Sequence, residues 1–203
     1  MTNHNDNLLM VFIKNPIEGK VKTRLARTVG NAIALEVYLK LLAYTLDVTH
    51  ILNCDKAVFY SDFIEDEDVW KKEGFQQHIQ NGNDLGERMQ NAFAKAFSRK
   101  YKKVLIIGSD CPELSTAILN KAFEELEAND FVIGPTYDGG YYLLGMKTFH
   151  PAVFVDKEWS TENVFLDTII DINKAELSYA VLPSLSDLDD EKDLKIFAKK
   201  LRT

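Results

Sequence analysis

Short apolar runs alternate with longer stretches of helical spacing along the whole chain. The short runs are rich in branched and aromatic residues and end at turn-forming positions, which is typical of buried strands. We predict strands over residues 8–14, 57–61, 75–80, 103–110, 130–136, 140–146 and 177–183. We predict helices over residues 30–52, 84–100, a segment starting after Ser115, 161–174 and 190–201, with Asp84 and Ser115 as N-caps.

Strands that alternate with helices predict an α/β fold with a mostly parallel sheet covered on both faces. The strand at 140–146 follows the one at 130–136 too closely for a crossover helix, so we expect it to run antiparallel. Residues 1–7 are polar and are expected to form a disordered tail, which leaves 8–203 as a single domain. A chain of 203 residues with 46% hydrophobic content can bury the core of such a domain.

Composition narrows the range of partners. The formal net charge of −7 argues against general binding to nucleic acid or to anionic membranes, because both require a broad positive field. No apolar run approaches the roughly 20 residues that span a bilayer, and the start of the chain lacks a secretory pattern. The cysteines form no CxxC pair and the histidines show no zinc-ligand spacing. We therefore expect a cytoplasmic protein without a structural zinc site.

The loop over residues 12–25 follows the first predicted strand. Beside a single acid, Glu18, it gathers several cations: Lys14, Lys20, Lys22 and Arg24. Gly19 precedes Lys20, yet the loop lacks the second glycine and the Ser or Thr of a P-loop. A flexible cationic loop after a first strand still neutralises phosphates well. The alternative interpretation is a solvated basic surface.

An acid follows the most apolar predicted strand, in the sequence GSDCP at 108–112. Asp110 is a good oxygen ligand for Mg²⁺ or Mn²⁺, and the alternative is that it caps the turn into the next helix. Cys111 is a weak candidate nucleophile because no histidine lies near it in the sequence.

Glycine and acid pairs mark two later loops. In YDGGYY at 137–142, Gly139 and Gly140 allow close approach of a ligand beside Asp138, although the same residues suit a plain hairpin turn. In LSDLDDEKDL at 185–194, Asp187 and Asp189 point to one side if the backbone is extended. The alternative there is an acidic helix start, which Asp190 would cap.

Several motifs together carry a family resemblance. They are KNPIEGKVKTRLA, DLGERM, GSDCPEL, GPTYDGGYYLLG and LSDLDDEKDL, and they cover roughly residues 8–195. The chain resembles the glycosyltransferase-A-like family called radical-SAM/selenodomain-associated transferase 1. That family is related to the 2-phospho-L-lactate and molybdenum-cofactor guanylyltransferases. The resemblance implies a three-layer α/β/α fold of the nucleotide-diphospho-sugar transferase type.

The resemblance also implies roles for particular residues. It places nucleotide phosphates on the opening loop, at Lys14, Gly19, Lys20, Lys22 and Arg24. It implies Mg²⁺ or Mn²⁺ at Asp110, Asp187 and Asp189. To the nucleotide site we add Arg88, from the loop NGNDLGERM, together with Asp138, Gly139 and Gly140. Lys22, Arg24 and Asp110 are the expected catalytic residues. The opening loop departs from the glycine-rich LAGG-like start of the molybdenum-cofactor enzymes, so guanine specificity is not implied.

The function expected from these features is a metal-dependent transferase that uses a nucleotide-sugar or a nucleoside triphosphate, resembling a glycosyltransferase. One alternative is a nucleotidyltransferase of the guanylyltransferase type, and another is a non-catalytic nucleotide-binding module. A dinucleotide-dependent oxidoreductase is excluded, because the first loop lacks GxGxxG. The acceptor is an unknown small molecule, for which Trp159 is either a stacking surface or part of the core.

Overall fold

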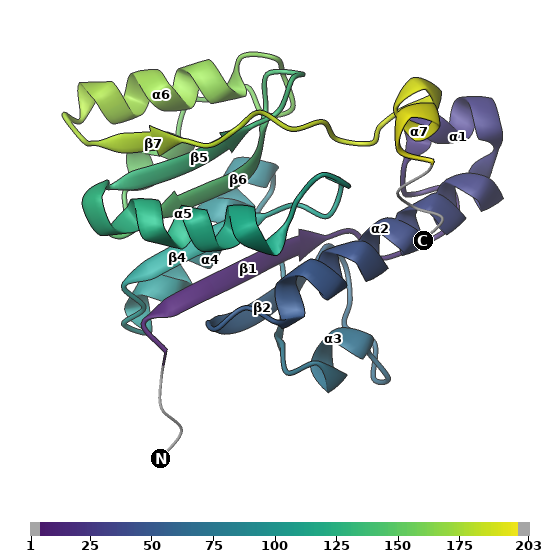
Figure 1. The fold of residues 1–203 in the computed structure, drawn as a ribbon, viewed down its shortest axis with the longest axis horizontal. Coiled ribbons are helices and arrows are strands. Elements are labelled where there is room, and N and C mark those ends of the chain that lie inside the picture. Colours follow the sequence, from purple (N-terminus) through teal and green to yellow (C-terminus); the bar gives the residue numbers. More distant parts are fainter. Residues whose placement is uncertain (1–4, 199–203) are drawn as a thin grey trace.

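A seven-stranded sheet forms the middle layer of the computed structural model, which describes residues 5–198 (Figure 1). Its strands are β1 (Asn7–Ile13), β2 (Asp55–Tyr60), β3 (Gln76–Ile79), β4 (Lys103–Ile107), β5 (Phe131–Pro135), β6 (Tyr141–Met146) and β7 (Tyr179–Val181). They lie in the order β3-β2-β1-β4-β6-β5-β7. The β6 strand runs antiparallel to β4 and β5, while the other neighbouring pairs are parallel. The predicted fold class and the predicted antiparallel strand are confirmed.

Helices cover both faces of the sheet, as its apolar strands require. They are α1 (Thr23–Val29), α2 (Asn31–His50), α3 (Val69–Lys72), α4 (Leu85–Ser98), α5 (Thr116–Ala128), the 3-10 helix η1 (Pro151–Phe154), α6 (Val164–Lys174) and α7 (Glu191–Phe197). Successive β1 residues alternate between two cores: Leu9 packs with residues of α2 and α5, and Met10 with residues of α4, α6 and η1. The α/β/α layering therefore follows from the two-residue period of the strands.

A third, smaller core lies beyond the edge of the sheet where α1, α2 and α7 meet. It contains Leu25 from α1, Leu41 from α2, Leu188, and Phe197 from α7. Helices α1 and α7 come from opposite ends of the chain and lie side by side (Figure 1). This core brings the segment before α7 next to the loop after β1.

The predicted helix over 30–52 corresponds to α2, and a separate helix precedes it. Gly30 stands between α1 and α2 with φ 85° and ψ 160°, a conformation that breaks a helix and that glycine adopts most easily. Helix α1 therefore begins inside the stretch predicted as a cationic loop. The sequence prediction missed α1 because its seven residues are too few for a clear helical period.

Other boundaries shift by a few residues. The predicted N-caps are confirmed, since the side chains of Asp84 and Ser115 accept hydrogen bonds from the first turns of α4 and α5. Strand β4 ends at Ile107, and the short helix η1 was not predicted.

The chain ends bear on two further predictions. Of the expected tail, residues 1–4 lie outside the described residues, while Asn7 begins β1. The predicted helix over 190–201 runs beyond residue 198, and its end lies outside the described residues. Among residues 5–198, no helix is both long enough and apolar enough to cross a bilayer.

Candidate active site

The carboxyl ends of β1 and β4 meet at one edge of the sheet, because the two strands are parallel neighbours. Val11 pairs with Ile107 near those ends. The loops that follow, which carry the predicted cations and Asp110, therefore leave the sheet side by side. In an open α/β sheet this edge is where ligands bind.

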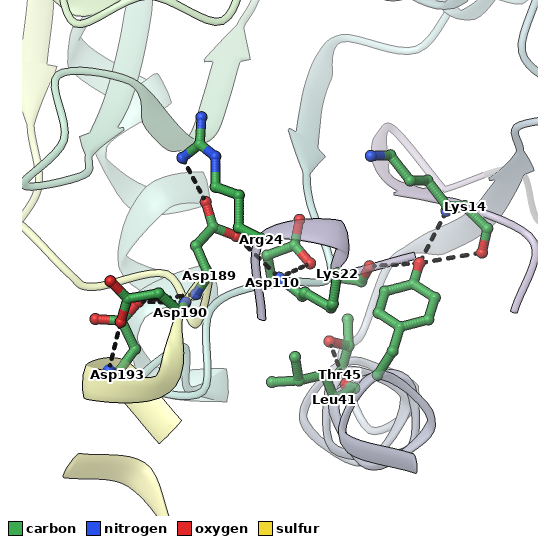
Figure 2. A network of polar contacts seen from close by, with 11 residues as sticks. Lys14, Lys22, Arg24, Leu41, Thr45, Asp110, Asp189, Asp190 and Asp193 are labelled. Carbon is green, nitrogen blue, oxygen red and sulfur yellow. Dashed lines mark hydrogen bonds and ion pairs between the residues drawn. The ribbon is translucent and has the colours of Figure 1, made fainter. Parts of the chain in front are cut away.

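Lys22 joins the two loops and a third segment from the far end of the chain. Its ammonium lies 2.5 Å from Oδ1 of Asp110 and 3.2 Å from Oδ1 of Asp189 (Figure 2). The guanidinium of Arg24 lies 3.5 Å from the other oxygen of Asp189. The side chain of Lys22 is only 4% exposed, whereas those of Asp110 and Asp189 are 45% and 40% exposed. Lys22 and Arg24 thus form one cluster with Asp110 and Asp189, and Lys22 is at its buried centre.

The charge on Lys22 is stabilised although it is buried. Burial alone would lower the pKa of Lys22, but the negative charges of Asp110 and Asp189 raise it above its usual value. At neutral pH the group is therefore a cation held between two carboxylates.

Tyr38, from α2, contacts the loops after β1 and β4 and so fixes their relative position. Its hydroxyl accepts a hydrogen bond from the backbone N–H of Lys14 at 2.9 Å and lies 3.0 Å from the backbone oxygen of Lys14. The same hydroxyl lies 3.3 Å from Oγ of Ser109, the neighbour of Asp110. Burial, followed by the charge of Asp110, raises the pKa of Tyr38, so the hydroxyl keeps its proton. Sequence reasoning assigned Tyr38 only to the apolar helix, and the polar end of its ring was the available signal.

The late acids reach the cluster on an extended segment. The backbone N–H of Leu188 donates to the backbone oxygen of Asp110 at 2.9 Å. Leu188 is fully buried in the small core, while Asp187 and Asp189, on either side of it, both interact electrostatically with Lys22. The alternation is the one expected for extended backbone. Asp190 forms a capping box at the start of α7, as predicted.

The carboxyl group of Asp187 is strongly perturbed by its surroundings. Burial first, then the charge of Asp110, raises the pKa of Asp187 to about 7, while Lys22 acts in the opposite direction. Asp189 and Asp138 raise it further. Such a concentration of acids favours the uptake of a cation or a proton.

The glycine turn between β5 and β6 lies near the late acids, since Asp138 acts electrostatically on Asp187. Oδ1 of Asp138 accepts hydrogen bonds from Oγ1 of Thr136 at 2.5 Å and from the backbone N–H of Gly140 at 3.2 Å. Asp138 therefore also stabilises a hairpin turn. Both interpretations of this loop fit its geometry.

Two motif glycines make room for the segment before α6. A Cβ on Gly139 would lie 1.9 Å from the backbone oxygen of Glu162. A Cβ on Gly86 would lie 2.1 Å from the indole nitrogen of Trp159. Trp159 packs against the core and stacks on Phe154, with ring centroids 6.4 Å apart. These contacts support the core interpretation of Trp159.

The other predicted phosphate-binding residues lie on the exposed part of the opening loop. Gly19 has φ 77°, which suits glycine in the turn that the N–H of Lys20 closes onto the oxygen of Ile17. The side chains of Lys14 and Lys20 have no ion-pair partner among residues 5–198. They are available to an anionic ligand.

Arg88 contacts the loop after β3 and lies apart from the Lys22 cluster. Its Nε donates to the oxygen of Gly82 at 3.0 Å, and its NH1 lies 3.5 Å from Oε1 of Gln80. Gln80 in turn donates to the backbone oxygen of Ile13 at the end of β1. Within residues 5–198, Arg88 makes no direct contact with Lys22 or Asp110, so the structure does not bring it into the cluster.

Asn15 ties the opening loop to the loop after β2, and sequence reasoning missed it. Its amide donates to the oxygen of Phe63, and its side-chain oxygen accepts from the N–H of Asp62. Only 3% of Asn15 is exposed. A polar residue directly after a buried strand was the signal that could have identified it.

The acids suit a divalent cation that is shared with a ligand. Among residues 5–198, no group of three or more His, Cys, Asp or Glu side chains is arranged to hold a metal ion by itself. Mg²⁺ typically uses one or two carboxylates, with phosphate oxygens and water completing its shell. Asp110 and Asp189, which already share a cation in Lys22, fit that role.

Cys111 is not activated. Burial, then the charge of Asp187, raises the pKa of the Cys111 thiol to about 12, so it is protonated at neutral pH.

A protein-family model described as "Uncharacterized protein conserved in bacteria (DUF2064)" matches residues 45–161. The matched part contains Asp110 and Asp138, while Lys22 and Asp189 lie outside it. No curated protein matches the chain.

Several solved structures are similar to the chain. One is from Desulfovibrio desulfuricans G20, a protein provisionally assigned as a nucleotide-diphospho-sugar transferase: it is 31% identical, has a TM-score of 0.84, and the match covers 98% of this chain and 97% of that one. A cytidylyltransferase from Leptospira borgpetersenii is 16% identical, with a TM-score of 0.57 over 89% of this chain and 76% of the other. The 4-diphosphocytidyl-2C-methyl-D-erythritol synthase from Anaerococcus prevotii is 13% identical, with a TM-score of 0.62 over 98% of this chain and 97% of the other. The last two share the fold alone.

The packing of Gly139 predicts a large difference between two neighbouring substitutions. Gly139→Ala should destabilise the protein by about 2 kcal/mol or more, because φ is 91° and the new Cβ would overlap the backbone of Glu162. Gly140→Ala is the matched control and should cost less than about 1 kcal/mol, because its Cβ would meet only side-chain atoms, the Thr136 hydroxyl at 3.1 Å and Oδ1 of Asp138 at 3.5 Å. Urea unfolding of both variants measures the difference, and equal losses would contradict this account.

The raised pKa of Asp187 predicts a pH-dependent stability in the presence of a chelator. The folded protein holds this proton more tightly than the unfolded chain, so the stabilising contribution is complete below pH 4 and is lost as pH rises toward 7. Asp187→Asn cannot ionise, so its stability relative to the wild type should increase by about 1 kcal/mol or more between pH 4 and 8. Urea unfolding at several pH values tests this, and a constant difference would refute it.

Proposed function

The chain belongs to the DUF2064 family of uncharacterized bacterial proteins, and from the geometry of its site we propose that it is a nucleotide-dependent transferase. Its opening-loop and glycine-turn motifs lead us to place it, within that family, in the radical-SAM/selenodomain-associated group. We propose a nucleotide-sugar or a nucleoside triphosphate as the donor and a small molecule as the acceptor.

One observation carries this proposal. Cations from the loop after β1 and acids from the loops after β4 and β7 meet at the same edge of the sheet, through the contacts of Lys22 with Asp110 and Asp189. A polyphosphate requires cations, and a divalent ion that accompanies it requires oxygen ligands. The site offers both within a few ångströms. A merely solvated basic loop would not bury one of its lysines against two acids.

In this proposal, different residues bind the phosphates, stabilise the departing phosphate and hold the metal ion. Lys14 and Lys20 are exposed and unpaired within the described residues, so they can bind the incoming phosphates. Lys22 and Arg24 lie closer to the acids and would stabilise the charge that develops on the departing phosphate. Asp110 and Asp189, with Asp187 beside them, would hold Mg²⁺ or Mn²⁺. When bound, such an ion supplies Lewis-acid stabilisation of phosphate oxygens.

Two reactions are compatible with this arrangement. In glycosyl transfer, an acceptor hydroxyl attacks the anomeric carbon and its proton passes to solvent, the bond from that carbon to the phosphate oxygen breaks, and a nucleoside diphosphate leaves. In nucleotidyl transfer, an acceptor phosphate or carboxylate oxygen attacks the α-phosphorus, and pyrophosphate leaves. Both reactions develop negative charge on the leaving phosphate, next to Lys22 and Arg24.

We favour glycosyl transfer because the 31% identical relative is provisionally assigned as a nucleotide-diphospho-sugar transferase. Nucleotidyl transfer is the second candidate, supported by the fold that the chain shares with cytidylyltransferases. A non-catalytic nucleotide-binding module is the third. It is less favoured because a degenerate site would be expected to have lost Asp110 or the late acids, and both are present here.

The donor class can be identified by ligand-induced stabilisation. With Mg²⁺ present, we expect either nucleotide-sugars or nucleoside triphosphates to raise the melting temperature, since a ligand at 100 times its Kd stabilises by about 2.7 kcal/mol. Nucleotide-sugars are the expected class. Stabilisation by triphosphates alone would favour nucleotidyl transfer, and stabilisation by neither would contradict the proposal. Binding without turnover across a wide acceptor screen would favour the non-catalytic module.

Asp110→Asn separates a ligand role from a structural one. If Asp110 holds the cation, the variant should fold and lose at least about tenfold in Mg²⁺-dependent nucleotide affinity. If it serves only the turn, the variant should lose about 1 kcal/mol of stability and keep binding. Asp190→Asn is the matched control, because Asp190 caps α7 and does not contact Lys22. Isothermal titration calorimetry with and without Mg²⁺ measures both variants.

A further inference from the structure

Lys22 occupies the point where a shared cation would be expected between Asp110 and Asp189. Its ammonium contacts one oxygen of each, at 2.5 and 3.2 Å. The ammonium approaches from the buried side, while the two carboxylates keep nearly half of their surface exposed. In Figure 2 the lysine lies between the two acids, below the exposed guanidinium of Arg24. Lys22 therefore neutralises the two carboxylates on their buried side, while their other side is open to solvent.

The backbone of Lys22 is held in an unfavourable conformation. Lys22 has φ 45° and ψ 45°, in the left-handed region that residues other than Gly, Asn and Asp rarely adopt. It is the N-cap of α1, yet no side chain caps that helix. Lys22 keeps this strained backbone while its ammonium is paired with Asp110 and Asp189.

An ammonium and a divalent cation compete for the same oxygens. Mg²⁺ binds carboxylate oxygens at about 2.0–2.1 Å and demands near-octahedral geometry. An ammonium already in contact with Oδ1 of Asp110 would lie close to such an ion, and the two positive charges would repel. Occupancy of both acids by Lys22 and by a divalent ion is therefore mutually unfavourable.

We propose that Lys22 is a placeholder for the divalent cation, which neutralises Asp110 and Asp189 in the resting protein and leaves them for the nucleotide phosphates when cation and nucleotide bind together. This inference rests on the proposed function, from which it takes the cation and the nucleotide. The divalent ion alone binds weakly, because it must displace Lys22 without offering it a new partner. The phosphates supply that partner, so the two ligands bind cooperatively.

Binding of Mn²⁺ without nucleotide tests the placeholder role, with the free-ion signal in electron paramagnetic resonance as the readout. Lys22→Met should bind Mn²⁺ at least about tenfold more tightly than the wild type, a coupling typical of linked sites. Lys22→Arg keeps the positive charge and should bind as weakly as the wild type. Lys40→Met is the matched control for loss of one charge, since Lys40 pairs with Glu36 on the exposed side of α2, and its affinity should not change.

Further variants show where the more tightly bound Mn²⁺ lies and whether the change in affinity comes from misfolding. Lys22→Met combined with Asp110→Asn should lose the gained affinity, which places the ion at Asp110. Lys22→Gln removes the charge but keeps a hydrogen-bond donor, and circular dichroism shows which variants fold. Equal or weaker Mn²⁺ binding by the folded Lys22→Met or Lys22→Gln variant overturns the inference. The proposed function is tested separately by nucleotide binding to the wild type with Mg²⁺, so either can fail while the other stands.

Discussion

A buried ammonium group between two carboxylates holds together parts of the site that are far apart in the sequence. Lys22 precedes α1, Asp110 follows β4, and Asp189 precedes α7. Removing a charge from water is costly, and it is tolerated only where opposite charges compensate closely. Here the two acids more than offset the burial of Lys22, since its pKa is raised. The position of α1 against α7 and the composition of the site thus depend on the same contact.

Neutral contacts surround this ion pair and limit where it can form. The hydroxyl of Tyr38 holds the loops after β1 and β4 at a fixed separation, and the N–H of Leu188 ties the late segment to Asp110. Asn15 anchors the opening loop to the loop after β2. These partners are backbone groups or uncharged side chains, so they fix geometry without adding charge. The charges of the site come from the lysines, Arg24 and the acids.

The layers of the fold could be predicted from the sequence because strand and helix periods are local properties. The antiparallel β6 followed from the short connection after β5, and the caps of α4 and α5 followed from single residues. The sequence also identified Lys22, Asp110 and Asp189 as candidates, but it could not reveal that they touch, since this depends on the core formed by α1, α2 and α7. Tyr38 and Asn15 were missed because their importance lies in which distant backbone atoms they meet.

The charges of the site bear on how a nucleotide could enter it. The opening loop contributes Lys14, Lys20, Lys22 and Arg24, and the acids Asp110, Asp138, Asp187 and Asp189 lie close enough to one another or to Lys22 to interact. The two sets nearly cancel, so a polyphosphate alone would leave the site strongly negative. In the proposed function, a divalent cation that arrived with the phosphates would restore the balance, and it would also release Lys22 toward them. The acids would repel phosphates by themselves, and in the proposed function they would be the reason why the phosphates need a companion ion.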